Sequence, residues 1–590
     1  MNNLGRAADA SLRFVKIMLG KIMILPAMIL PSLAASPDLI VHHGKIATVD
    51  KSFSIHEAMA VRGARIVAVG RNDDVLKLQG PDTKLVDLGG KLVLPGLIDS
   101  HTHPSGACLT EFDHPLPNFE TVHDVLDYIK ARTKVVKEGD WIVLRQVFIT
   151  RLREKRYPTR AELDAAAPNH PVLYSTGPDA SVNSLALKLS GIDRNFKVKE
   201  GDPGFAEKDP KTGEPTGILR RCGGYLKVKT TAKSPTEAES FQRQVELFKD
   251  YNSVGLTTVA DRDCSDRTVA RYVKLRDEGR LTVRIPVVLG FSSSGDIPKI
   301  QENIRRAAEH PLFKDKSGPV RVIGVKTYLD GGMLTGSAYM RQPWGVSETY
   351  SITNPAYRGV LFIPHERLVP MVRAAVESDL QFTAHTVGDG AVHALLDAYE
   401  EVNKTTPIRH SRPCISHSNF MSREAVAQAA RLGVSLDIQP AWLYLDTRTL
   451  VAHFGYDRLR YFQPLRTCFE LGANAGGGSD HMQKIGSLRS NNPYDPFLGI
   501  WTAITRKARW YDGQLHPEES LTREQAIQFY TRNNAYLLRL DEEVGSLEPG
   551  KRADFIVLDR DLLTCSADDI RGAKVLRTYF DGKLVHQREN

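Results

Sequence analysis

Two histidines separated by a single residue, His101 and His103, have the spacing of metal ligands. They follow an apolar run at residues 92–98, in the segment Leu-Pro-Gly-Leu-Ile-Asp-Ser-His-Thr-His. In extended backbone, side chains two residues apart point the same way, so both imidazoles can face one ion. Imidazole is also a common zinc ligand. The spacing therefore favours a metal site, although two unrelated loop histidines would show the same pattern.

Three further polar residues end apolar runs in the same way. His385 and His417 each close a strand-like run, and Asp480 follows the glycines 476–478 at the end of another. In a parallel barrel, catalytic groups gather at the carboxyl ends of the strands. The repetition therefore predicts that these side chains share one site with His101. Taken alone, a Ser-Asp pair after glycines is typical of a helix cap or a turn.

Lys326 ends an apolar run in which a lysine is unexpected. A buried ammonium group is costly, so such a lysine is normally paired, lowered in pKa or chemically modified. The alternatives are a side chain that extends to solvent and a salt bridge to Asp330, four residues further on. The sequence leaves these alternatives open.

The elements that position these residues alternate between apolar strand-like runs and helical stretches. This alternation favours parallel βα units and, at this length, a (β/α)8 TIM-type barrel in the α/β class, which we place at residues 93–540. The span exceeds a typical barrel, so we expect a large insertion at about 104–250. Nine runs are found, one too many for eight strands: 92–98, 171–174, 256–260, 283–289, 320–329, 381–385, 413–416, 434–438 and 473–478.

The two ends of the chain share a different texture. Short β-type runs separated by glycine turns occupy residues 38–70 and return only at residues 545–583. We therefore expect residues 37–92 and 541–590 to pair as one discontinuous β-sandwich domain.

The first 36 residues resemble a signal peptide. A basic region precedes an apolar run at 22–30, and small residues follow at 32–36. This pattern predicts an exported protein, periplasmic or secreted, with a retained membrane anchor as the alternative. The net charge is +8, of which the first 21 residues carry +3. The remainder is too mild and scattered to favour nucleic acid or a stable membrane association after cleavage.

With these motifs in order, the chain resembles the amidohydrolase superfamily, and within it the subfamily of N-substituted formamide deformylases. The resemblance runs from about Asp38 to the C-terminus. It rests on the His101–His103 segment, the strand before Asp330-Gly331, the His385 strand before Gly388-Asp389, the Ser416-His417 strand, the Gly478-Ser479-Asp480 end and the segment 545–554.

The resemblance implies a site with one or two divalent ions, with zinc the expected metal. In such a site His101 and His103 bind one ion, and His385 and His417 bind a second. A carboxylated Lys326 bridges the two ions, and Asp480 binds the first ion and transfers protons. The implied activity is hydrolysis of a carbon–nitrogen bond in an amide-like small molecule by a metal-activated hydroxide. The resemblance leaves a homo-oligomer open.

One departure from the family pattern bears on specificity. Pro178 stands where many relatives carry a histidine by the substrate, so Asp179 or Asn183 becomes the candidate pocket residue; a turn with a capping asparagine is the alternative. His410 and His481 are candidate partners of ligand imidazoles. Gln439 and Arg506 are candidate substrate contacts.

Two other functions compete with amide hydrolysis. An esterase or lactonase would use the same metal centre, because metal-activated hydroxide attacks both kinds of acyl group. A non-catalytic binding protein on a barrel scaffold is the third reading, since fold alone does not fix function. Members of that type usually lose metal ligands, whereas all six candidates are present here.

Overall fold

The computed structural model describes residues 36–177, 179–200 and 204–589. Pro178 and nearly all of the predicted signal peptide therefore lie outside the described residues. Within the described part of the chain, no helix combines the length and the apolar character needed to cross a bilayer.

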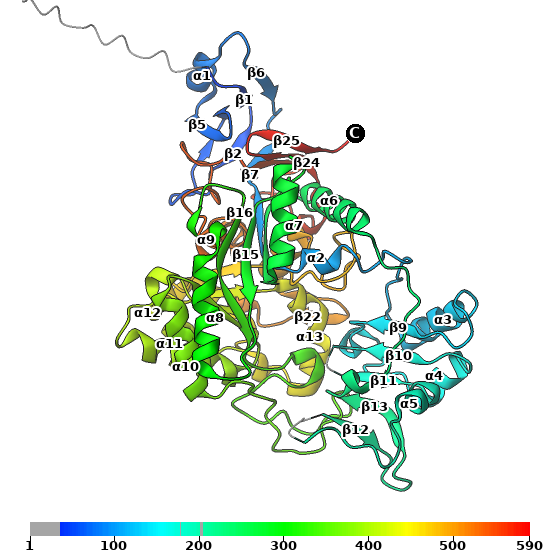
Figure 1. Ribbon diagram of the computed structural model, residues 1–590. Helices are drawn as coiled ribbons and strands as arrows, with labels where there is room; N and C mark the ends of the chain where they lie inside the picture. Colours follow the sequence, from blue (N-terminus) through cyan, green and yellow to red (C-terminus); the bar gives the residue numbers. More distant parts are fainter. Residues whose placement is uncertain (1–35, 178, 201–203, 590) are drawn as a thin grey trace, which may run out of the picture.

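The central element is a parallel eight-stranded barrel, as expected (Figure 1). Main-chain hydrogen bonds close the sheet just past the carboxyl ends of its first and last strands, where Asp480 N donates to His101 O and His103 N donates to His481 O, both at 2.8 Å. The strands, in order around the barrel, are β8 (Leu97–Thr102), β14 (Leu256–Cys264), β15 (Ile285–Gly290), β16 (Val320–Tyr328), β17 (Gln381–Thr386), β18 (Cys414–His417), β19 (Ser435–Ile438) and β20 (Ala475–Gly477).

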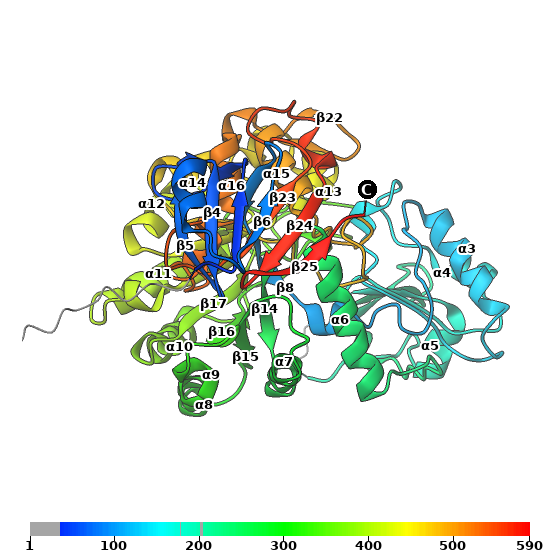
Figure 2. The ribbon, with the colours of Figure 1, turned by 90° about the horizontal axis from the view of Figure 1, so that it is seen from above.

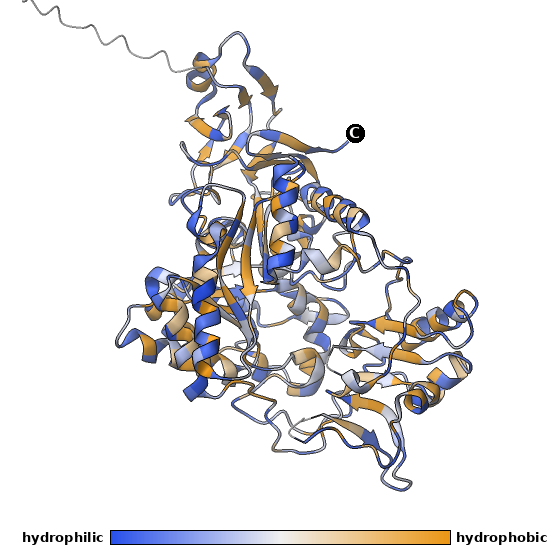
Figure 3. Ribbon diagram, in the orientation of Figure 1, coloured by the Kyte–Doolittle hydropathy of each residue, from blue (hydrophilic) through white to orange (hydrophobic). Residues whose placement is uncertain are grey.

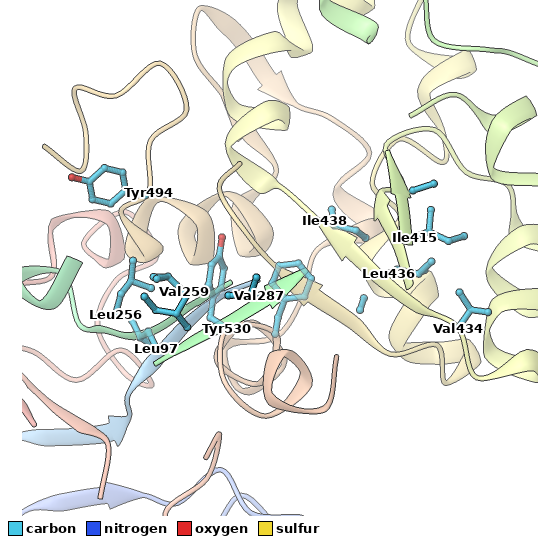
Figure 4. Close-up of a cluster of buried hydrophobic side chains, with 14 of the residues drawn as sticks. Leu97, Leu256, Val259, Val287, Ile415, Val434, Leu436, Ile438, Tyr494 and Tyr530 are labelled. Carbon is cyan, nitrogen blue, oxygen red and sulfur yellow. The ribbon is translucent and has the colours of Figure 1, made fainter. Parts of the chain in front are cut away.

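Apolar residues explain why these segments form a buried sheet wrapped by helices. The barrel strands are largely apolar, whereas the surrounding helices alternate apolar and polar residues (Figure 3). Helix α8 (Ile297–Glu309), for example, buries Ile300, Ile304 and Ala307, which are spaced by four and three residues and so share one face. Figure 4 shows the corresponding core, in which strand residues such as Leu97 and Val259 lie together.

One of the nine predicted barrel strands, residues 171–174, is wrong. The run 171–174 lies in β10 (Val172–Ser175). This strand belongs to a separate five-stranded sheet, formed by the part of the chain that connects β8 to β14 (Figure 1). A short, fully buried strand has the same apolar pattern in either sheet, so the sequence could not separate them. The order of this second sheet is β12 (Phe205–Lys208), β13 (Pro215–Arg220), β11 (Ala180–Val182), β10 and β9 (Ile142–Arg145).

The two ends of the chain meet in one sheet. Strand β7 (Leu92–Pro95) pairs antiparallel with β23 (Phe555–Leu558), and β24 (Val575–Phe580) continues the sheet. Figure 2 shows these late strands beside the early strands β4 (Ala58–Arg62) and β5 (Arg65–Gly70), which belong to a second sheet. Met59 and Val61 share a buried cluster with Phe555 and Tyr579, so residues of both sheets pack together. The sandwich domain with its stated boundaries stays a prediction.

Candidate metal centre

The six residues singled out in the sequence lie at one end of the barrel. Each is at, or within three residues of, the carboxyl end of a strand, because parallel strands bring their carboxyl ends to the same rim. His101 is the last residue but one of β8, and His103 lies just beyond that strand. Lys326, His385 and His417 lie near the ends of β16, β17 and β18, and Asp480 follows β20.

His101, His103 and Asp480 form the tightest group of metal-type donors. Their candidate ligand atoms all lie within 4.8 Å of one another. Asp480 Oδ1 is 3.3 Å from His103 Nε2 and 3.6 Å from His101 Nε2. Two imidazole nitrogens and one carboxylate oxygen are the donors that zinc takes in catalytic sites, so the residues present fit a divalent ion.

His385 and His417 lie beside this group. The ring centroids of His101 and His417 are 4.7 Å apart, and those of His385 and His417 are 4.5 Å apart. On its other side, His417 stacks on the indole of Trp442 at 4.9 Å. Four imidazoles therefore meet at the barrel rim, with His101 and His417 buried and His103 and His385 partly exposed.

Lys326 lies inside the cluster. The residue is 1% exposed, and its Nζ is 3.0 Å from His101 Nε2. The alternative salt bridge to Asp330 is not formed, because the Asp330 carboxylate accepts main-chain hydrogen bonds from Tyr339, Val387 and Gly388 instead. Among the described residues, no carboxylate lies within ion-pair distance of Lys326. Burial lowers the pKa of this amine.

Burial favours the neutral form of three imidazoles, those of His101, His385 and His417. It lowers the pKa of His101 and of His417 well below the ordinary value, and with the positive charge of Lys326 it lowers the pKa of His385 to about 3. A neutral imidazole has a free nitrogen lone pair. These three imidazoles are therefore in the protonation state that binds metal.

Sequence reasoning missed the partners that orient the imidazoles. His101 Nδ1 lies 2.7 Å from Asp437 Oδ2, and Gln439 Oε1 lies 2.8 Å from His417 Nδ1. Gln439 Nε2 donates to Asp437 Oδ1 at 3.0 Å, so one hydrogen-bonded chain links the two histidines. The signal was present in the sequence: Asp437 and Gln439 are polar residues two apart at the end of an apolar strand, which places both on one face.

Other sequence-based assignments are corrected by the contacts. Gln439 orients His417, which accounts for its position by the site. Arg506 is fully buried and donates to the carbonyls of Phe462, Gln463 and Leu515, a structural role. Neither His410 nor His481 makes a hydrogen bond from its ring to a ligand histidine within the described residues: the His410 ring contacts Val376 O, and the His481 ring contacts Tyr251 and the carbonyls of Gln483 and Lys484.

A cavity of about 760 Å³ opens above the cluster, which contributes His103, Lys326, His385, His417 and Asp480 to its wall. Most of the remaining wall is apolar and comes from the insertion and from the loop after β16. Its aromatic members are Phe148, Phe205, Tyr328, Tyr350, Tyr357, Phe362 and Trp442.

Of the two candidate pocket residues that follow Pro178 in the sequence, only Asp179 lines the cavity. Asp179 lines the cavity, but its carboxylate already pairs with Arg220 at 2.9 Å and accepts from Arg221 N at 3.0 Å. Asn183 caps helix α5 (Ser184–Ser190) through Ala186 N and is buried away from the cavity. The capping alternative is therefore the correct one for Asn183.

A parallel barrel whose strand ends gather histidines and a carboxylate beneath a deep pocket defines the class of metal-dependent barrel hydrolases. Comparison with protein families agrees. The model of the Amidohydrolase family matches residues 84–586, and the chain belongs to that family. It is accordingly a metal-dependent hydrolase of carbon–nitrogen bonds other than peptide bonds.

Individual relatives cover nearly the whole chain. N-substituted formamide deformylase of Arthrobacter pascens is 28% identical over 571 residues, which span 93% of this chain and 98% of the relative. The putative amidohydrolase YtcJ of Bacillus subtilis is 26% identical, over 93% and 99% of the two chains. A solved structure of an uncharacterized metal-dependent hydrolase from Pyrococcus furiosus has a TM-score of 0.62 at 22% identity, covering 89% of this chain and 100% of that one, and supports the fold.

Proposed function

We propose that this protein hydrolyses the carbon–nitrogen bond of an N-substituted amide, with formamides the first class to test. The observation that carries the proposal is the group of His101, His103 and Asp480, whose donor atoms lie within 4.8 Å of one another, with His103 and Asp480 on the cavity wall. The similar deformylase from Arthrobacter pascens, named for N-substituted formamides, supports the choice of substrate.

In this proposal His101, His103 and Asp480 hold one divalent ion, with zinc expected. His385 and His417 hold a second, and a carboxylated Lys326 lies between the two. Such ions supply Lewis-acid activation of water and of the acyl oxygen. The burial of Lys326 without a carboxylate partner supports its modification, because a carbamate would replace a costly buried cation by an anion that metal ions stabilise.

The proton transfers fall to Asp480. Its carboxylate lines the cavity, so it can accept a proton from the attacking water and return it to the nitrogen that leaves as the amine. The neutral imidazoles of His101, His385 and His417 stay unprotonated through this cycle, since burial lowers their pKa values. Asp480 is therefore the acid–base residue of the proposed site, and the histidines act only as metal ligands.

The cavity favours an amide with a bulky apolar substituent. Aromatic side chains supply much of its wall, and Phe362, at 38% exposed, lies where solvent reaches the cavity. Burial of an aromatic or alkyl group against these side chains is favourable in proportion to the apolar area removed from water. The small formyl group would then face the histidines, and the apolar substituent would lie against the aromatic side chains.

Metal analysis combined with a substrate panel tests the proposed function. Purified protein should contain one or two divalent ions per chain and lose its activity with a chelator, then regain it with added zinc. N-substituted formamides and acetamides should be hydrolysed faster than matched esters and lactones. Preference for the esters would instead support the esterase reading.

The double variant His101→Ala/His103→Ala separates catalysis from binding alone. We expect it to remain folded and to lose turnover together with bound metal. Unchanged turnover would exclude these histidines from the mechanism. A wild-type protein that binds the panel but hydrolyses none of it would favour the non-catalytic barrel.

A further inference from the structure

Asp480 is held in a backbone conformation that needs outside support. Its φ is +56°, a left-handed value that residues other than glycine seldom adopt. Asn492 supplies that support, because its Nδ2 donates to Asp480 O at 2.6 Å and lies 3.3 Å from Asp480 Oδ2. One amide group therefore contacts both the main chain and the carboxylate of the proposed acid–base residue.

The orientation of the Asn492 amide is set by Arg151. Arg151 Nη1 donates to Asn492 Oδ1 at 2.8 Å, and also to Asn491 O at 2.7 Å. A guanidinium can only donate, so the amide oxygen must face Arg151 and the amide nitrogen must face Asp480. Arg151 thus determines which end of the Asn492 side chain Asp480 meets.

Arg151 is itself held by two bonds to one carboxylate. Its Nε lies 3.2 Å from Asp446 Oδ1 and its Nη2 lies 3.0 Å from Asp446 Oδ2, a paired geometry that restrains the guanidinium plane. Arg151, Asp446 and Asn492 are each at most 9% exposed. The chain Asp446–Arg151–Asn492–Asp480 is therefore a buried hydrogen-bonded network in which Asp446 compensates the charge of Arg151.

This network joins two parts of the molecule. Arg151 ends the short helix η2 (Ile149–Arg151) of the insertion, Asp446 lies in α13 (Pro440–Phe454) of the barrel, and Asn492 lies in the loop beyond β20. None of the three lines the cavity as the described residues outline it. They are therefore placed to act on Asp480 and not on a substrate.

We propose that Arg151 and Asn492 are positioning residues for Asp480, through which the insertion completes the catalytic site of the barrel. The inference rests on the proposed function for the role of Asp480, and it adds that this role depends on a side chain from the insertion. Without the network, the Asp480 carboxylate would sample other directions, and both proton transfer and metal binding would weaken.

A double-mutant cycle tests the chain of contacts. Asn492→Ala and Arg151→Met should each lower kcat by about 10- to 100-fold with little change in KM, since neither residue contacts substrate. If Arg151 acts through Asn492, the double variant should be no slower than Asn492→Ala alone. If the double variant loses kcat by the product of the two single-variant losses, the two residues act independently and the proposed pathway is overturned.

Metal affinity gives a readout that does not depend on turnover. Equilibrium dialysis with zinc should show weaker binding to Asn492→Ala than to wild type, because Asp480 is one of the proposed ligands. Unchanged zinc affinity together with unchanged kcat would refute the positioning role. If wild type binds zinc but hydrolyses no amide, the proposed function fails while the positioning role is still decided by these affinities.

Asn252→Ala is the matched control for loss of a buried amide. Asn252 is fully buried in the barrel and its Nδ2 donates to two carbonyls, those of Leu256 and Thr282. The Asn252→Ala variant should lower the thermal midpoint of unfolding about as much as Asn492→Ala does, but leave zinc affinity and kcat near wild type. If Arg151→Met fails to fold, Arg151→Lys keeps the charge and loses the paired geometry, and an unchanged kcat in that variant would contradict the proposal.

Discussion

The imidazole Nδ1 of His101 lies 2.7 Å from Oδ2 of Asp437, and both side chains are completely buried. A carboxylate at this position accepts a hydrogen bond from Nδ1–H and so fixes the tautomer in which Nε2 carries the free lone pair. Nε2 is the nitrogen that faces Lys326 and Asp480. Asp437 therefore orients the first proposed metal ligand, as the carboxylate partners of metal-binding histidines commonly do.

Replacing Asp437 by asparagine should weaken metal binding. The Asp437→Asn side chain keeps the size but loses the charge, so the imidazole tautomer is no longer fixed, and we expect zinc affinity to fall by about 10- to 100-fold. Competition with a chelator of known affinity measures this directly. The control is Asp495→Asn, at the cap of helix α15 (Pro496–Thr505), where asparagine caps as well as aspartate. Equal losses in both variants would count against the assigned role.

Replacing Lys326 by alanine should remove the proposed bridge between two ions. We expect Lys326→Ala to bind fewer ions per chain and to lose activity by about 100-fold or more, with partial recovery in formate or bicarbonate, which can occupy the vacated space as small carboxylates. Metal stoichiometry and turnover with and without these anions provide the measurement. An alanine variant with intact activity would rule out the bridging role.

Loss of an aromatic side chain at the cavity should change substrate preference more than catalysis. Phe362→Ala should raise KM for amides with large apolar substituents by about 2- to 10-fold, because an aromatic contact contributes about 0.5–1.5 kcal/mol. The KM of the Phe362→Ala variant for N-methyl amides should stay near that of wild type. Val135→Ala serves as the control, since Val135 is 71% exposed and does not line the cavity. A uniform rise in KM across the panel would argue against an apolar substituent in this position.

Acid should weaken one cap in the insertion. The side-chain hydrogen bond from Arg156 holds the pKa of Glu162 at about 2, below its ordinary value of 4.5. A lowered folded-state pKa means that the stabilisation is fully present above pH 4.5 and is lost as pH falls towards 2. The pair is partly solvated, so we expect Glu162→Gln to destabilise by about 1 kcal/mol at neutral pH and by less near pH 3.

Denaturant unfolding of both proteins at pH 7 and pH 3 measures this difference. Asp124→Asn is the control, because Asp124 forms the same kind of capping box at helix α3 (Val122–Thr133) and makes no ion pair with a basic side chain of the described residues. A gap between wild type and Glu162→Gln that stays constant with pH would show that the ion pair contributes no pH-dependent stability.

Much of the fold followed from local pattern. Eight of nine predicted strands lie in the barrel because buried parallel strands are apolar runs bounded by polar turns, a signal that short segments carry by themselves. The error at residues 171–174 arose where that signal is ambiguous. Val172–Ser175 is as buried as a barrel strand, and only its hydrogen bonds to β9 and β11 assign it to the insertion.

The sequence by itself determined which side chains could bind metal, since His101, His103, His385 and His417 end apolar strands and parallel strands share a carboxyl rim. Only the tertiary structure decided which groups support them. Asp437 orients His101, and Arg151 acts on Asp480 through Asn492. Arg151 and Asn492, which are hydrogen-bonded, are 341 positions apart in the sequence. Such partners have no characteristic spacing, because their contacts arise from how separate parts of the chain pack and not from the repeat of one strand.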